Sequence, residues 1–97
     1  MTNFKFKLLG MEWQVENVCD KENIFSEGLH GLCVPQETKI YIADGDSPSQ
    51  KKNTLIHESL HAIEKTLNLE FTEEEIHGLS AGIHELIQQP EWLKRAK

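Results

Sequence analysis

The segment His57–His61, which reads His-Glu-Ser-Leu-His, has the spacing H-E-x-x-H and lies within a longer helical pattern. On an α-helix, side chains four residues apart lie on the same face, one turn above each other. Two imidazoles at this spacing can share one tetrahedral metal ion, and Glu58 could then act as a base on a water that the metal activates. Because the spacing also arises by chance, the surrounding sequence must support it.

The residues around the motif predict a helix that runs to about Leu67. Ser47 is a suitable N-cap, Pro48 takes the first helical position, and Gln50 completes a capping box. Asn68 suits the left-handed position that ends a helix. The two histidines fall on the flank of the predicted apolar stripe, where a ligand is partly desolvated yet open to water. This buried stripe is predicted to consist of Ile56, Leu60, Ile63 and Leu67.

A catalytic zinc site usually has three protein ligands, so a third ligand is needed beside the two histidines. Glu64 shares a face with His61, but it lies about 10 Å along the helix axis from His57, which is too far for one ion. A second helix begins after Thr72 with the acidic run 73–75. Acidic residues are favoured at any helix N-terminus, so at most one of the three is expected to be a ligand.

Glu73 is the preferred third ligand. Glu75 is expected to form a capping box with Thr72, and Glu74 points nearly opposite the face of Ile76, whereas Glu73 falls about 60° from the centre of that face. His77 is the main alternative ligand, and His77 or His84 could instead orient a ligand or donate to a developing negative charge. The predicted apolar face of this helix consists of Ile76, Leu79, Ile83, Leu86 and Ile87, with Pro90 closing the helix and Trp92 expected to pack back onto the core.

Alternating apolar and polar residues predict a small sheet before the motif helix. The runs 4–8 and 11–16 flank Gly10 and are typical of a β-hairpin. Further strands are expected at 29–34 and Lys39–Ala43, and the segment 19–28 reads as a loop or a short irregular helix. The sequence therefore predicts a single α+β domain over residues 1–97. Its small N-terminal antiparallel sheet has three to four strands, and two core helices follow, the first carrying H-E-x-x-H.

Composition excludes several other classes of protein. The 97-residue chain has 10 Lys+Arg against 16 Asp+Glu, a formal net charge of −6, and no basic stripe, which argues against a nucleic-acid partner. No apolar run approaches the roughly 20 residues of a membrane span. The first residues lack the apolar core of a signal peptide, so a cytoplasmic location is expected. In that reducing compartment, Cys19 and Cys33 are expected to be free thiols.

Two segments together resemble a known family. The stretch Thr54–Ile63, followed by Leu69–Ser80, resembles the gluzincin metallopeptidases, in particular their small, often phage-encoded members related to the ImmA/IrrE-type peptidases. The resemblance implies a minimal gluzincin-like fold in which His57, His61 and Glu73 bind Zn²⁺ and Glu58 is the general base. The predicted hairpin, Gly28 and the strand at Ile40–Ile42 also fit the short sheet of that family.

The motif and the resemblance together lead to one expected function and one alternative. We expect a zinc-dependent metallopeptidase that hydrolyses peptide bonds in a peptide or protein substrate. An extended peptide could bind by strand addition to Lys39–Ala43 if that strand lies at the sheet edge nearest the motif helix. The alternative is a zinc-containing protein-binding or regulatory module of phage origin with weak or no hydrolysis. A third possibility is that the H-E-x-x-H spacing binds no metal.

Overall fold

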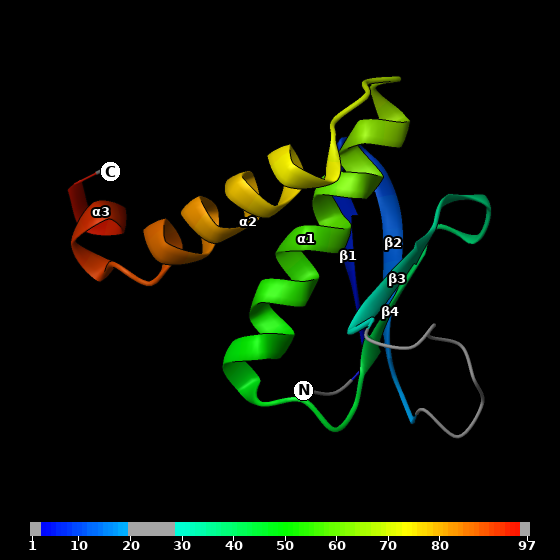
Figure 1. Cartoon of the computed structure of the whole chain (residues 1–97), viewed down its shortest axis with the longest axis horizontal. Coiled ribbons are helices and arrows are strands. Elements are labelled where there is room, and N and C mark those ends of the chain that lie inside the picture. Colours follow the sequence, from blue (N-terminus) through cyan, green and yellow to red (C-terminus); the bar gives the residue numbers. More distant parts are fainter. Residues whose placement is uncertain (1–2, 20–28, 96–97) are drawn as a thin grey trace.

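The computed structural model describes residues 3–19 and 29–95, apart from the side chains of Pro90, Trp92 and Leu93 (Figure 1). The predictions for the loop at 20–28 and for the packing of Trp92 lie outside the described residues. The strands are β1 (Phe4–Leu8), β2 (Met11–Val18), β3 (Gly31–Val34) and β4 (Lys39–Ala43); a 3-10 turn at Pro35–Glu37 joins β3 to β4, and the helices are α1 (Pro48–Thr66), α2 (Glu73–Ile87) and α3 (Pro90–Arg95).

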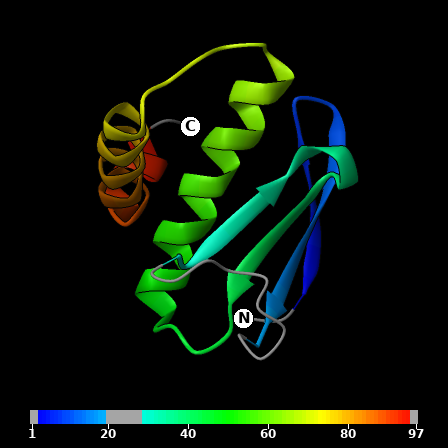
Figure 2. The same ribbon diagram turned by 45° about the vertical axis from the view of Figure 1, so that its right-hand side comes forward.

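The α+β class is confirmed, with the strands preceding the long helices. Figure 2 shows α1 lying between the sheet and α2, so the described chain forms successive layers of sheet, helix and helix. No helix in the described part of the chain is long and apolar enough to cross a membrane.

The sheet is mixed, so the prediction of an antiparallel sheet is wrong for one strand pair. Its order is β1-β2-β4-β3, and β2 pairs with β4 in parallel, whereas the β1/β2 and β3/β4 pairs are antiparallel. The chain from β2 to β4 is long enough for the crossover that parallel pairing needs. This order makes neighbours of the two strands that carry the fully buried residues, with Val15 opposite Ile40 and both completely buried.

The predicted hairpin at Gly10 is confirmed. Leu8 pairs with Met11, which leaves Leu9 and Gly10 as a two-residue loop. Both loop residues have positive φ, 51° at Leu9 and 82° at Gly10. Positive φ at both positions is the geometry of a type I′ turn, whose twist matches that of the flanking strands.

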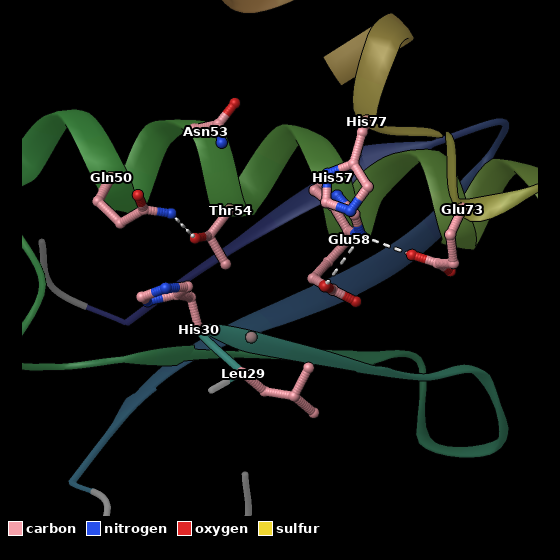
Figure 3. A pocket seen from close by; sticks show the side chains of 10 residues that line it. Leu29, His30, Gln50, Asn53, Thr54, His57, Glu58, Glu73 and His77 are labelled. Carbon is pink, nitrogen blue, oxygen red and sulfur yellow. Dashed lines mark hydrogen bonds and ion pairs between the residues drawn. The ribbon is translucent and has the colours of Figure 1, made fainter. Parts of the chain in front are cut away.

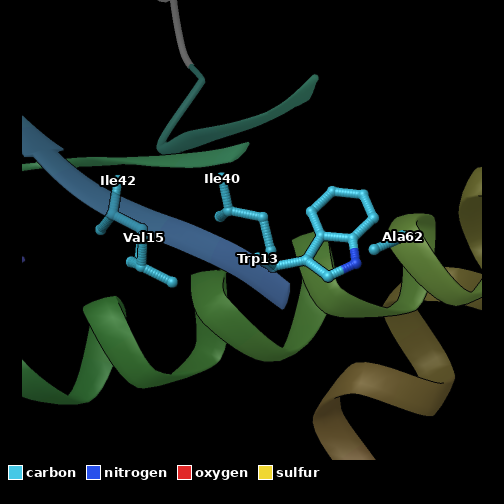
Figure 4. Packing of buried hydrophobic residues seen from close by; sticks show 5 residues of the cluster. All are labelled: Trp13, Val15, Ile40, Ile42 and Ala62. Carbon is cyan, nitrogen blue, oxygen red and sulfur yellow. The ribbon is translucent and has the colours of Figure 1, made fainter. Parts of the chain in front are cut away.

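The hydrophobic core lies between the sheet and α1 (Figure 4). Only Ala62 among the fully buried apolar residues comes from α1, and its small side chain lets the helix lie close to the sheet. The remaining members come from β2 and β4, so the two central strands supply most of this core. The fully buried cluster consists of Trp13, Val15, Ile40, Ile42 and Ala62.

The layered arrangement gives α1 two covered faces, which corrects the predicted stripe. Ser80 of α2 donates to the Asn53 carbonyl oxygen at 3.3 Å, so the side of α1 that bears Asn53 faces α2. Ile56 and Leu60 follow at three and seven residues and share that side, where they are only partly buried, while Leu67 is 52% exposed. The most buried residues of α1 are instead Lys51, Thr54, Glu58, Ala62 and Glu64.

The predicted starts of both helices are confirmed, with one difference. Thr72 and Glu75 form the expected capping box at α2. At α1, the Ser47 side chain accepts from the Gln50 backbone, but the Gln50 side chain does not return the bond and donates to Thr54 instead.

The apolar face of α2 is packed only in part, because α2 extends beyond α1. Ile76 is fully buried, whereas Leu79, Leu86 and Ile87 are 39–46% exposed.

Candidate metal centre

His57 and His61 lie side by side on α1, as their spacing predicts. Their ring centroids are 5.0 Å apart. The two side chains are 17% and 23% exposed, so they are partly desolvated but still reached by solvent. This is the placement that a metal ligand needs if the ion is also to meet a substrate.

Glu73, the first residue of α2, completes a group of three possible ligands. Its Oε1 lies 3.4 Å from His61 Nε2, and its Oε2 lies 3.8 Å from His57 Nε2. One atom from each of the three side chains lies within 4.8 Å of the other two. Ligands at about 2.1 Å from a tetrahedral zinc ion are about 3.4 Å apart, so small adjustments of an exposed glutamate bring this group to that geometry. These three side chains therefore form a group that could hold a metal ion.

Glu64 turns His61 toward this group, a role that the sequence prediction missed. It is not a ligand, in agreement with the distance along the helix, but its Oε1 lies 3.1 Å from His61 Nδ1. Its other oxygen accepts a hydrogen bond from the Phe71 backbone N–H, which ties the link between the helices to α1. The bonds from Phe71 and His61 lower the pKa of Glu64, so it remains ionised. Glu64 follows His61 by three residues and therefore shares its helix face, and this spacing is the sequence feature from which the contact could have been predicted.

The link between α1 and α2 places Glu73 over the histidines. Asn68 adopts the predicted left-handed conformation, with φ of 56°. The Leu69 backbone N–H then donates to the Glu64 carbonyl oxygen at 2.8 Å, which ends the helix and reverses the chain. Since the Phe71 N–H is also bound by Glu64, the start of α2 is held at a fixed place relative to His61.

The other candidate residues of α2 lie in different surroundings. The His77 ring is 4.9 Å from the His57 ring, measured between centroids, so His77 lines the site without joining the ligand group. His84 lies further along α2, where the Gln88 side chain donates to it at 2.6 Å. It does not line the cleft between β3 and α1. Glu75 is engaged in the capping box.

The side chain of Glu58 extends from α1 toward β3, beside the three possible ligands. It is 8% exposed, and its Oε2 is 4.0 Å from His57 Nε2. Burial raises the pKa of this carboxyl, and the nearby charge of Glu73 raises it further, while His61 and a hydrogen bond from the Cys33 backbone lower it. A carboxylate whose proton affinity is raised in this way is suited to accept and return a proton.

The electrostatics also favour a neutral imidazole at His57. Burial lowers the pKa of His57, and the positive charges of His61 and His77 lower it further, against an opposing effect of Glu73. Metal ions bind the neutral form of imidazole, so a lowered pKa reduces the competition from protons.

The strand that faces α1 at the sheet edge is β3, so the strand addition predicted for β4 does not apply to β4. β4 lies between β2 and β3. Ala43 N donates to His30 O at 2.9 Å, and in the register of this antiparallel pair the N–H and C=O groups of Gly31 and Cys33 therefore point away from β4. Among the described residues, the strand edge that could take up a peptide thus belongs to β3, where Glu58 occupies the Cys33 N–H.

Gly31 allows α1 to approach this edge strand closely. A Cβ atom added at Gly31 would collide with Thr54 Cγ2, and would lie 3.1 Å from Tyr41 O and 3.2 Å from Glu58 Cγ. Only a residue without a side chain leaves room for the helix that carries Glu58. The sequence predicts a strand at this position, but the contact with α1 was not predicted.

A cleft between β3 and α1 opens into two hollows that meet at Glu58, and Figure 3 shows the residues that line the first. The first has a volume of about 170 Å³ and extends along the first half of α1, past Thr54 to Gln50. The second has a volume of about 360 Å³ and extends the other way, past His61 to Lys65 and Pro35. His57, Glu58 and Glu73 line both hollows, so the possible metal group stands at their junction.

Cys19 and Cys33 are free thiols, as predicted, but only Cys33 lies near this cleft.

Comparison of the chain with models of known protein families, with curated proteins and with solved structures finds no match.

Proposed function

We propose that this protein is a zinc-dependent metallopeptidase of the gluzincin type. The observation that carries the proposal is the convergence of the Nε2 atoms of His57 and His61 on the Glu73 carboxylate. Two imidazoles and a carboxylate are a donor set that suits Zn²⁺. Glu58 lies buried beside this group and next to an open strand edge, which a purely structural zinc site would not require.

His57, His61 and Glu73 would hold the zinc ion. When bound, zinc supplies Lewis-acid polarisation of a carbonyl and lowers the pKa of water. Glu58 accepts a proton from the attacking water as the new C–O bond forms at the carbonyl carbon. It then gives that proton to the amide nitrogen as the C–N bond breaks, so that the products are a carboxylic acid and an amine. The raised pKa of Glu58 suits this exchange.

The open edge of β3 supports a peptide substrate over a small molecule. The Gly31 backbone groups and the Cys33 carbonyl oxygen point away from β4 and can pair with an extended chain, whereas the Cys33 N–H already donates to Glu58. Such a chain would pass through the cleft beside Glu58. Because the cleft continues on both sides of Glu58, it favours cleavage within a peptide over removal of a terminal residue.

The test combines metal analysis with a hydrolysis assay. We expect one zinc ion per chain in the purified protein and cleavage of a mixed peptide library. Glu58→Gln should keep the zinc and lose hydrolysis by several orders of magnitude. Glu73→Gln should lose zinc, whereas the matched control Glu74→Gln, one residue along the same helix, should keep it.

Three outcomes of these experiments would contradict the proposal or favour the alternative. An absence of bound metal, or a Glu58→Gln variant that cleaves peptides at the parent rate, would overturn the proposed mechanism. Zinc at one per chain with no cleavage of any library peptide would favour the protein-binding module instead.

A further inference from the structure

We infer that this protein cleaves peptides between a large apolar residue and a small polar residue, in that order along the substrate. This inference rests on the proposed function and specifies its substrate class. It comes from the different chemistry of the two hollows on either side of Glu58.

The first hollow is the smaller of the two and has the larger share of hydrogen-bonding side chains in its lining, beside Leu29, which lines both hollows. Gln50 donates to Thr54 Oγ1 at 3.1 Å, which leaves the Gln50 carbonyl oxygen without a partner among the described residues (Figure 3). His30 is held by Asp46, with Nδ1 and Oδ2 2.9 Å apart, so its other ring nitrogen is available. His77 faces the same space from α2. A polar side chain would pair with these groups, whereas an apolar one would cover them and leave them unpaired.

The second hollow has about twice the volume and a more apolar lining. Leu32, Cys33 and Pro35 line it along β3 and the turn that follows. Burial raises the pKa of the Cys33 thiol to about 12, so this side chain is uncharged and adds to the apolar character. Lys65 is the one lysine that the described residues contribute to this lining, and it is exposed at the far end. The hollow therefore suits a large apolar side chain.

The direction of β3 gives the order of the two residues. β3 runs alongside α1 in the same direction, from Gly31 beside Thr54 toward Pro35 in the lining shared with Lys65. Antiparallel pairing is the more stable way to add a strand to an edge. An antiparallel peptide would run from the apolar hollow toward the polar hollow. Its apolar residue therefore comes before the cleaved bond and its polar residue after it.

Four peptides with identical flanking residues test this inference. Their central pairs are Leu-Asn, Asn-Leu, Leu-Leu and Asn-Asn, and kcat/KM is measured for the zinc-loaded protein with the cleavage position read by mass spectrometry. We expect cleavage between Leu and Asn, with kcat/KM at least about tenfold above that of the other three peptides. Equal rates, or a preference for Asn-Leu, would overturn the inference.

Binding separates this inference from the proposed function. The affinities of the same four peptides are measured on zinc-loaded Glu58→Gln. If no peptide is hydrolysed by the parent protein, the proposed function fails, but the order of affinities still tests the preference. Tightest binding of the Leu-Asn peptide supports the inference, and similar affinities for all four overturn it.

A single substitution tests the assignment of the polar hollow. Gln50→Met removes the hydrogen bond to Thr54 and replaces an amide by an apolar group of similar length. The ratio of kcat/KM for Leu-Asn over Leu-Leu should fall by about tenfold, without loss of zinc. Gln14→Met, on β2 and outside both hollows, is the matched control and should leave this ratio unchanged. If the Gln50→Met variant keeps the parent ratio, the polar residue of the substrate does not bind in the first hollow.

Discussion

Glu64 Oε1 lies 3.1 Å from His61 Nδ1, so the ring of His61 is turned with its Nε2 toward Glu73. A carboxylate in this position fixes both the orientation and the tautomer of a histidine ligand, because the Nδ1–H is committed to the carboxylate. The same carboxylate also binds the Phe71 N–H at the start of the segment that leads to Glu73. One buried acid thereby positions two of the three possible ligands.

The first prediction concerns this contact. Glu64→Gln keeps an acceptor for Phe71 but removes the negative charge beside His61. We expect zinc affinity to fall by about 10- to 100-fold, as measured by competition with a chelator. The matched control is Glu70→Gln, an exposed acid in the link between the helices, which should leave the affinity within about twofold. An unchanged affinity in Glu64→Gln would mean that Glu64 serves only to hold the link.

The second prediction concerns the pKa of His57 in the metal-free protein. Burial and the charges of His61 and His77 lower it from 6.5, so NMR titration should give a midpoint below 6.5. Because the unfolded chain then binds more protons than the folded one, this residue makes the metal-free fold less stable as pH falls through about 6.5. His77→Ala should raise the His57 midpoint, since it removes a like charge. His84→Ala, seven residues further along α2, should not move it.

The third prediction concerns the cost of burying Glu58. Its folded pKa is raised above 4.5, so the folded state binds more protons than the unfolded state between 4.5 and the raised value. The metal-free protein should therefore lose stability as pH rises through this window and stay at the lower level above it. Glu58→Gln should flatten this dependence and unfold at higher urea concentration at pH 7. A variant less stable than the parent at pH 7 would show that the charged form of Glu58 is favoured by the fold.

The fourth prediction concerns the close approach of α1 to β3. Gly31→Ala should destabilise the protein by about 1–3 kcal/mol in urea unfolding, because the new methyl group collides with Thr54 Cγ2 and the β-branched Thr54 side chain has little freedom to turn. The double variant Gly31→Ala/Thr54→Ser removes the colliding atom but keeps the hydroxyl that binds Gln50, and should recover a large part of the loss. Gly82→Ala, at an open position on α2, should be neutral or stabilising. A failure of the double variant to recover stability would assign the strain to Tyr41 and Glu58 instead.

The local sequence was sufficient for features that depend on neighbouring residues. The pairing of His57 with His61 follows from helical spacing, and the caps at Ser47 and Thr72 follow from side chains that bond backbone groups three residues away. The turn at Gly10 follows from the pattern on either side of it. The choice of Glu73 came from helical angles and from the capping box expected of Glu75, and the structure brings Glu73 to the two histidines.

Only the tertiary structure decided which strands and faces meet, because such contacts join residues far apart in the chain. A period-two pattern does not say which strand becomes a neighbour, so the parallel pairing of β2 with β4 and the edge position of β3 were not predicted. The buried side of α1 was misassigned for the same reason, since hydrophobic periodicity does not distinguish a helix with one covered face from a helix between two layers. The packing of α1 between the sheet and α2 decides which groups surround Glu58, Gln50 and Gly31. It also decides that the two hollows of the cleft differ in their lining.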